Sequence, residues 1–282
     1  MKSVFIEIIL TSILICGCSV ANSPVETEIS TSPMINNTVN TDIANTIVPH
    51  TSDPIQTDGP DSAFPIASGT HLMRYEDESI FSYMDYYLFI PENAKSNMPI
   101  IVFLHGDGQV GRQDTLENYG MMESARSIYG EDYPFIAVYP CTRIASWTDY
   151  PIPEMLIGLI ESTIALCSAD PQQVIITGHS RGAIGVWNMI STYGDYFAAA
   201  VPVSCGSDSD LNYSMCAKVP VLAIAGLSGD MEIRFQRQMH SIVEALIQVG
   251  GKAELMLLED SDHSDTCTDA YTVEVFQWML NN

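Results

Sequence analysis

The sequence predicts an α/β fold in which a mostly parallel central sheet is covered by helices on both faces. Short apolar runs of strand length alternate with amphipathic stretches of helix length from about residue 69 onward. Several of these runs are apolar at every position, which is typical of strands buried on both faces of a parallel sheet. At 282 residues, the chain is long enough for one such domain with a large core.

The first predicted strands form an antiparallel pair. Residues 71–75 and 83–90 have the pattern of strands, and Pro-Glu-Asn at 91–93 indicates a turn after them. Two continuous apolar runs follow at 99–104 and 134–139, and they predict buried parallel strands.

The same alternation continues through the second half of the chain. Helical spacing is found over 154–167, and a β-branched run from residue 174 predicts a strand that leads into a Gly-His-Ser-Arg-Gly motif. Further strands are expected at 198–204, 219–225 and 252–258, and further helices at 181–193, 231–249 and 268–280.

Ser180 lies in a Gly-x-Ser-x-Gly motif between a strand and a helix. This order is typical of a nucleophile elbow, a sharp turn that holds a serine in a strained conformation at the carboxyl end of a sheet. Gly178 and Gly182 make the turn possible, because a Cβ at either position would collide with the neighbouring strand or helix. The alternative is an ordinary strand-to-helix turn in which the serine caps the helix.

With these motifs the chain resembles the α/β-hydrolases, and in particular the lidless esterases, which include dienelactone-hydrolase-like, feruloyl or acetyl-xylan esterase and predicted peptidase members. The resemblance covers about residues 70–282. It depends on Leu-His-Gly-x-Gly at 104–108, on the serine motif, on an acid after the penultimate strand, and on His263 after the last strand. It implies the α/β-hydrolase fold, a serine hydrolase and no cofactor.

His263 is the predicted general base. A serine hydroxyl is a poor nucleophile near neutral pH and needs a base, and in this fold the triad follows the chain order serine, acid, histidine. Only His240 and His263 come after Ser180. His240 falls inside a predicted helix, whereas His263 lies in a polar loop just after the last strand.

The resemblance places the acid in the loop after the strand at 219–225. Asp230 fits that place and is the predicted partner that orients His263. The loop is one residue longer than the usual spacing between its glycine and the acid, so Glu232 stays open as the alternative. Asp230 would also suit the N-cap of the following helix.

The oxyanion hole is expected from the backbone N–H groups of Asp107 and Arg181. Arg181 follows the nucleophile directly, and Asp107 lies in the glycine-rich loop after an earlier strand. The Arg181 side chain is expected to pair with a nearby acid, and His105 is expected to brace its loop.

Trp147 is the predicted substrate-binding residue. It follows the strand at 134–139, and it would overhang the site as a stacking surface for an aromatic or sugar group. Hydrophobic closure of the loop is the alternative. Only 14 residues separate Ser204 from Val219, where this fold usually carries its cap, and this is too short for a helical lid. The site should therefore be open and suited to a small soluble ester or to an ester on a polymer.

The N-terminal residues predict export. Residues 1–18 have a basic start, an apolar stretch too short to span a bilayer, and small residues before Cys18. They resemble a bacterial lipoprotein signal, which implies lipidation of Cys18 and a membrane anchor. A plain secretory signal or an uncleaved anchor is the alternative. Residues 19–68 are polar and without periodicity, which predicts a flexible tether before a hydrolase domain at 69–282.

An exported domain permits disulfides. Cys205 with Cys216 would staple the loop between two strands, and Cys141 or Cys267 are further candidates around the site. No cysteine spacing fits a metal site, and Asp-x-Asp-x-Asn at 208–212 lacks the rest of a calcium loop, so no metal is assigned.

The formal net charge of −24 argues against nucleic acid as a partner, because such a surface repels phosphate backbones. The predicted function is hydrolysis of carboxylic esters through an acyl-enzyme on Ser180. Two alternatives stay open: a serine peptidase acting on short peptides, and an inactive hydrolase fold that binds a surface glycan.

Overall fold

The computed structural model describes residues 47–48, 64–80, 82–144 and 146–282. The predicted signal segment at 1–18, with Cys18, lies outside the described residues, as does most of the predicted tether at 19–68. Within the tether range, Ile47–Val48 form strand β1, which pairs with β2. In the described part of the chain, no helix has both the length and the apolar character needed to cross a bilayer.

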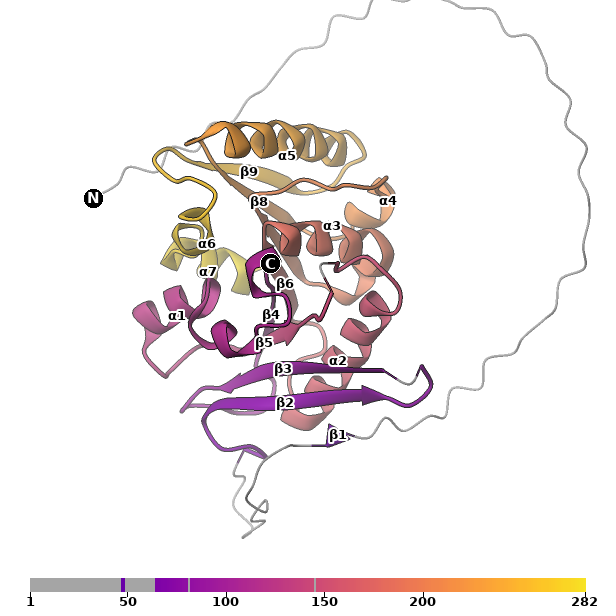
Figure 1. The fold of residues 1–282 in the computed structure, drawn as a ribbon, viewed down its shortest axis with the longest axis vertical. Coiled ribbons are helices and arrows are strands. Elements are labelled where there is room, and N and C mark those ends of the chain that lie inside the picture. The colour runs from indigo at the N-terminus through magenta and orange to yellow at the C-terminus, as the bar shows by residue number, and fades with distance from the viewer. Residues whose placement is uncertain (1–46, 49–63, 81, 145) are drawn as a thin grey trace, which may run out of the picture. The chain divides into compact units, whose positions relative to one another are not determined.

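A nine-stranded sheet forms the centre of the described residues (Figure 1). The strand order is β1-β2-β3-β5-β4-β6-β7-β8-β9, antiparallel up to the β3–β5 pair and parallel from β5 to β9. The strands after β1 are β2 (Gly69–Asp77), β3 (Ser82–Ile90), β4 (Ile100–Leu104), β5 (Ile136–Cys141), β6 (Val174–His179), β7 (Ala199–Val203), β8 (Val221–Gly226) and β9 (Ala253–Leu258). The predicted mostly parallel sheet is confirmed.

Helices cover both faces of this sheet and enclose two apolar cores. One core contains side chains of α2, α3 and α5, and the other contains side chains of α1 and α7. In Figure 1, α1 and α7 lie on one side of the strands, and α2 and α3 lie on the other. The helices are α1 (Met121–Tyr129), α2 (Ile152–Cys167), α3 (Arg181–Tyr193), α4 (Tyr213–Cys216), α5 (Asp230–Gln248), α6 (Thr266–Asp269) and α7 (Val273–Leu280), with 3₁₀ turns η1 (Asp107–Gln109), η2 (Gln113–Asn118) and η3 (Gly194–Tyr196).

Strand β4 shows why the parallel strands are apolar throughout. Ile100, Val102 and Leu104 are buried in one core, whereas Ile101 and Phe103 are buried in the other. Because successive side chains of a strand point to opposite faces, a strand covered on both sides needs apolar residues at every position.

Two helical features differ from the prediction. Helix α1 was not expected, although a parallel β4–β5 pair requires a crossover of this kind. The predicted last helix is divided into α6 and α7, because the Thr272 side chain accepts a hydrogen bond from the Val275 amide and caps a new helix there. Between β7 and β8 the described chain carries only the four-residue α4, so no cap covers the sheet at that point.

The parallel strands bring the functional segments to one edge of the sheet. Parallel strands point the same way, so their carboxyl ends lie together, and ligands of open α/β sheets bind outside that edge. Asp107 follows β4, Ser180 follows β6, Ser204 follows β7, Glu232 follows β8 and His263 follows β9.

Candidate active site

Ser180 occupies a sharp turn between β6 and α3. Its backbone has φ 57° and ψ −118°, a strained conformation for a residue with a side chain. A Cβ on Gly182 would lie 1.9 Å from the Leu104 carbonyl oxygen, and one on Gly178 would lie 2.8 Å from that same oxygen. The predicted steric reason for both glycines is confirmed. The Ser180 side chain makes no capping hydrogen bond to α3, so the capping alternative is wrong.

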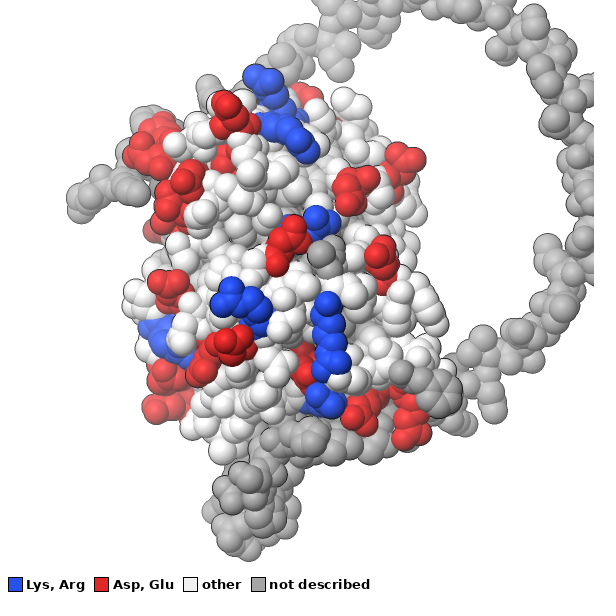
Figure 2. Space-filling view, viewed as in Figure 1, with Lys and Arg blue, Asp and Glu red and all other residues white. Residues whose placement is uncertain are grey.

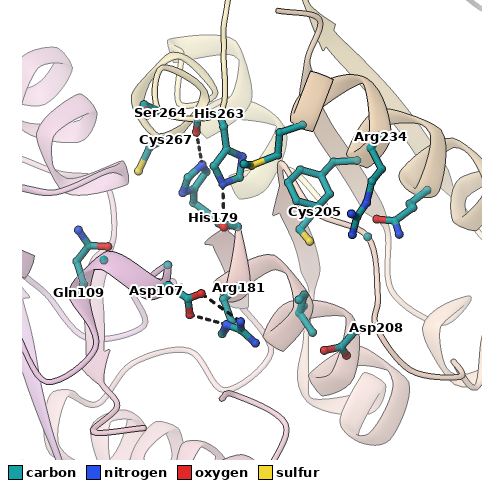
Figure 3. Close-up of a pocket in the computed structure, with 18 of the residues that line it drawn as sticks. Asp107, Gln109, His179, Arg181, Cys205, Asp208, Arg234, His263, Ser264 and Cys267 are labelled. Atoms are coloured by element: carbon teal, nitrogen blue, oxygen red, sulfur yellow. Dashed lines mark hydrogen bonds and ion pairs between the residues drawn. The ribbon is translucent and has the colours of Figure 1, made fainter. Parts of the chain in front are cut away.

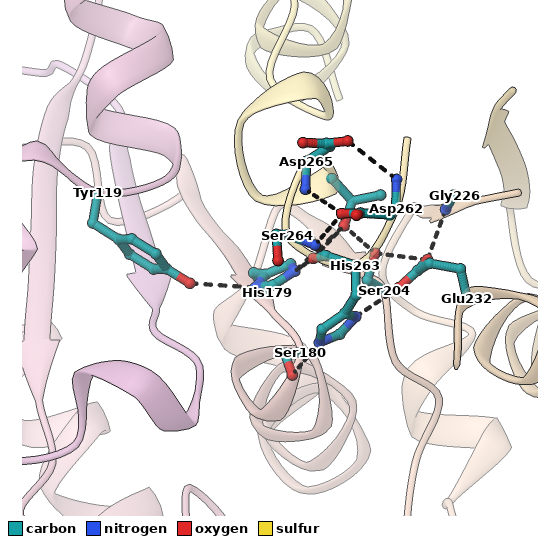
Figure 4. A network of polar contacts seen from close by, with 11 residues as sticks. Tyr119, His179, Ser180, Ser204, Gly226, Glu232, Asp262, His263, Ser264 and Asp265 are labelled. Carbon is teal, nitrogen blue, oxygen red and sulfur yellow. Dashed lines mark hydrogen bonds and ion pairs between the residues drawn. The ribbon is translucent and has the colours of Figure 1, made fainter. Parts of the chain in front are cut away.

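The Ser180 hydroxyl points to the imidazole of His263 (Figure 4). The distance from Ser180 Oγ to His263 Nε2 is 2.9 Å, and His263 Nδ1 lies 2.6 Å from Glu232 Oε1. A carboxylate only accepts hydrogen bonds, so Nδ1 donates to Glu232 and Nε2 is left to accept the serine proton. The three side chains therefore form a continuous hydrogen-bonded series.

The carboxylate that contacts His263 is Glu232 and not Asp230. Asp230 is the first residue of α5 and is exposed, and no hydrogen bond or ion pair joins its side chain to another residue in the described ranges. Successive helical residues are rotated by about 100°, so two positions along the helix the side chain points to the opposite side. Glu232 consequently faces the end of β8. Asp230 is also not the N-cap, because α5 begins at this residue after Gly229.

Glu232 is fully buried, at 0% exposure, and both oxygens of its carboxylate accept hydrogen bonds. Oε2 accepts a hydrogen bond of 2.8 Å from the Gly226 amide and one of 3.0 Å from the hydroxyl of Ser204. Buried carboxylates are costly unless they are hydrogen-bonded in this way. Ser204 was not identified from the sequence, and its φ of 55° is a left-handed conformation that residues with a side chain rarely adopt.

The backbone of His263 is also held. Its carbonyl oxygen accepts hydrogen bonds from His179 Nε2 at 2.8 Å and from the Thr266 hydroxyl at 3.0 Å. Burial is the main cause that lowers the pKa of His179 to about 4, so this imidazole is neutral near pH 7. With Nε2 donating, Nδ1 of His179 faces the Tyr119 hydroxyl at 3.4 Å. Sequence reasoning missed His179, which occupies a variable position of the serine motif.

The loop of His263 contains a further anchor at its exposed edge. Asp262 Oδ1 accepts hydrogen bonds from the amides of Ser264, at 2.7 Å, and Asp265, at 3.0 Å. The amides of Asp265 and Ser264 hold the pKa of Asp262 below its ordinary value. Asp262 therefore shapes the loop and does not contact the imidazole.

Asp107 and Arg181 stand at the positions expected for oxyanion-hole donors. They are the first residues of η1 and α3, where backbone N–H groups have no partner within the helix. The Arg181 guanidinium forms a two-point ion pair with the Asp107 carboxylate, so the predicted pairing of Arg181 with an acid is confirmed. This pair, which raises the pKa of Arg181, joins the two loops across the site.

Trp147 does not overhang the site. Its side chain is 2% exposed, it does not line the pocket, and its Nε1 donates a 2.9 Å hydrogen bond to the His105 carbonyl oxygen. The stacking interpretation is therefore wrong and the closure alternative holds, because the large indole completes the core beside Gly185. His105 braces its loop as expected: Nδ1 contacts the Gly106 carbonyl at 2.7 Å, and Nε2 accepts from the Thr142 amide at 3.2 Å.

The predicted disulfides are absent from the described residues. Cys205 lines the pocket just after β7, whereas Cys216 is buried in the apolar core at the end of α4. Their positions place one thiol at the site and the other in the core, so they do not staple the loop. The buried free thiols are Cys141, Cys167, Cys205, Cys216 and Cys267.

A pocket of about 680 Å³ opens over Ser180 and His263 (Figure 3). Its walls come from the loop after β4, the start of α3, the loop after β7, the first turns of α5, and the loop of His263. Its volume lies within the range of small-molecule sites. The lining combines apolar side chains such as Met231 and Phe235 with charged ones such as Arg181 and Arg234.

Comparisons with known proteins connect the chain to esterases. No family model matches it. It is 28% identical over 154 residues to feruloyl esterase B of Talaromyces stipitatus, covering 47% of this chain and 41% of that protein. It is 26% identical over 211 residues to acetylxylan esterase A of Aspergillus awamori, covering 68% of this chain and 65% of that protein. The chain thus spans less than two thirds of the length of each of these relatives.

The fold is similar to that of solved esterase structures. The crystal structure of a thermostable esterase superimposes with a TM-score of 0.60 at 20% sequence identity, over 74% of this chain and 62% of that one. At this identity the likeness concerns the fold.

Proposed function

We propose that this chain, which has the α/β-hydrolase fold and is similar in sequence to acetylxylan and feruloyl esterases, is a serine esterase that cleaves carboxylic esters. The observation that carries the proposal is the series Ser180–His263–Glu232, with contacts of 2.9 and 2.6 Å around a strained serine. The same series on a tight elbow is the arrangement that activates a serine hydroxyl for acyl transfer.

The reaction follows from the proton positions. His263 Nε2 takes the proton of Ser180 as Oγ attacks the ester carbonyl, and Glu232 stabilises the imidazolium that forms. The amides of Asp107 and Arg181 receive the negative oxygen of the tetrahedral intermediate. His263 then protonates the departing alcohol. In the second half, water attacks the acyl-enzyme with His263 as base, and the acid and Ser180 are released.

Substrates of two kinds suit the site: small soluble esters and esters attached to a polymer. The chain between β7 and β8 contributes only α4, so no cap on that side prevents a long polymer from reaching Ser180. The names of the relatives, acetylxylan esterase and feruloyl esterase, favour esters carried on a polysaccharide.

Labelling and turnover test the proposal. A fluorophosphonate probe should label the full chain, and Ser180→Ala should abolish labelling. His263→Ala should lower turnover of a short 4-nitrophenyl ester by on the order of 10³-fold, with an unchanged circular dichroism spectrum. Labelling that persists in Ser180→Ala would place the nucleophile elsewhere. Faster cleavage of a peptide anilide than of the matching ester would make the chain a peptidase.

We also propose that the chain is exported and anchored through a lipid on Cys18. The basic start, the apolar stretch and the small residues before this cysteine support the proposal. In a bacterium fed with a labelled fatty acid, the full chain should carry the label and partition into detergent, and Cys18→Ser should lose both properties. An unlabelled wild-type chain released into the medium would indicate plain secretion.

A further inference from the structure

Residues that line the pocket lie on both sides of His263, and the two sides are here called its arms (Figure 3). One arm is lined by Gln109, Tyr119 and Cys267. The other, here called the α5 arm, lies between the segment Cys205 to Asp208 and the first turns of α5. In Figure 3, Arg234 and Asp208 lie on the opposite side of His263 from Gln109. The two arms offer separate places for the two parts of an ester.

The α5 arm is built from one face of a helix. Met231, Arg234, Phe235 and Gln238 all line the pocket, and their spacing of three and four residues places them side by side along α5. The Phe235 ring lies 5.3 Å from the His263 ring, centre to centre. A group bound along this face is therefore adjacent to the reacting atoms.

The two arginines that line the pocket, Arg181 and Arg234, differ in whether an acid pairs with them. Arg181 is engaged by the two-point ion pair with Asp107, and Asp208 adds a second attractive charge near it. In the described ranges, no hydrogen bond or ion pair joins the Arg234 side chain to another residue. Its guanidinium carbon lies 5.7 Å from the centre of the Phe235 ring, and its charge also acts on the Cys205 thiol. Arg234 therefore lines the pocket with guanidinium N–H donors that no described residue accepts from.

Arg234 is a positive charge in a strongly acidic protein. The chain has a net charge of −24, and acidic side chains are distributed over the face shown in Figure 2. Such a surface repels anions at long range, so an anionic substrate needs a local cation at the site. A guanidinium suits a carboxylate because its fork of donors matches the two carboxylate oxygens.

We propose that the α5 arm is a subsite for an ester with an apolar body and a carboxylate at its far end, in which Arg234 binds the carboxylate and Phe235 and Met231 contact the body. The proposal rests on the proposed esterase function. It also assigns Asp208 an opposing role, because this acid lines the same arm and disfavours an anion there.

Two matched pairs of esters test the subsite and tell which half of the ester occupies it. The acyl-side pair is mono-4-nitrophenyl terephthalate and its methyl ester. The alcohol-side pair is 4-acetoxybenzoate and its methyl ester. In each pair a carboxylate away from the reacting carbonyl is replaced by its methyl ester, so a change between variants in the ratio of kcat/KM values for the anionic and the neutral member reports recognition of the charge.

In one of the two pairs, Arg234→Gln should lower this ratio about 10-fold, the order expected for loss of a charged hydrogen bond. Arg234→Lys should restore part of it, and Asp208→Asn should raise the ratio. Arg237→Gln is the matched control, since Arg237 is exposed on the same helix and does not line the pocket. Turnover of the neutral members by Arg237→Gln should match wild type, and the Arg234 and Asp208 variants are compared only through the ratio.

Equal changes of the ratio in Arg234→Gln and Arg237→Gln, in both pairs, overturn the proposal. Failure of the esterase function itself is recognised separately, because the neutral esters would then not be cleaved. In that case, terephthalate binding to Ser180→Ala, measured by calorimetry with and without Arg234→Gln, decides the question. Binding that weakens about 10-fold with the second substitution supports the subsite, and equal binding contradicts it.

Discussion

The two halves of the site are held by different means. Ser180 is fixed by the backbone: two glycines allow β6 and α3 to meet so closely that a Cβ on Gly182 would overlap the Leu104 carbonyl. His263 is fixed by side chains: Glu232 holds its ring, and His179 and Thr266 hold its carbonyl oxygen. The serine half depends on local sterics, whereas the histidine half depends on hydrogen bonds between elements distant in the sequence.

The largest effect is expected from a substitution in the serine half, because it should destabilise the fold itself. Gly182→Ala places a methyl group 1.9 Å from a backbone oxygen that cannot move without displacing β4. We expect a loss of about 3 kcal/mol or more in the free energy of unfolding, measured by urea titration.

Gly108→Ala is the matched control for this change. Gly108 lies in the loop after β4 and lines the same pocket, but a Cβ there meets no atom within 4 Å. It should change stability by less than about 0.5 kcal/mol. Equal losses in both variants would contradict a steric origin of the elbow.

The histidine half is expected to show a dependence on pH. The pKa of buried His179 is about 4, below the ordinary value of 6.5, so the unfolded chain binds the proton more readily. Stability from this group is complete above pH 6.5 and is lost as the pH falls toward 4, on the order of 3 kcal/mol in total. Burial also lowers the pKa of His105 to about 4, so the stability that this group contributes is likewise lost as the pH falls.

His179→Asn should therefore reduce the stability difference between pH 7 and pH 4.5 by about 2 kcal/mol, as measured from urea midpoints. It should also lower kcat, because the carbonyl of His263 loses a donor. His240→Asn is the control, since His240 pairs with Glu244 at the surface of α5. An unchanged pH dependence in His179→Asn would show that this imidazole is not the buried proton site.

The smallest expected effect concerns Trp147. Trp147→Phe removes the hydrogen bond to the His105 carbonyl and should cost about 1 kcal/mol in the free energy of unfolding. KM for a 4-nitrophenyl ester should stay within about twofold of wild type, since the indole does not line the pocket. A large rise in KM at unchanged stability would restore a direct role in substrate binding.

Much of the fold could be predicted from the sequence because it depends on patterns within short segments. The apolar runs of β4 to β8 predict their positions to within about two residues, and the two glycines predict the elbow from local sterics alone. Helix α1 was missed although Met121, Met122 and Ala125 form a buried face, because its apolar residues are few and no capping side chain marks its start.

The candidate site was only partly predictable, because its details depend on tertiary contacts. The choice between Asp230 and Glu232 is decided by where α5 begins, which turns one carboxylate outward and the other toward β8. Trp147 and the cysteines were assigned from chain position, which does not reveal whether a side chain points to the pocket or the core. A histidine in the variable position of the serine motif was the available signal for His179.

Turnover by Glu232→Gln and Asp230→Asn tests the central claim most directly. With a 4-nitrophenyl ester and both variants verified as folded, Glu232→Gln should lower kcat by on the order of 10²-fold or more, because the imidazolium loses its buried partner. Asp230→Asn should stay within about twofold of wild type. A severe loss in Asp230→Asn together with near-normal turnover in Glu232→Gln would contradict the account.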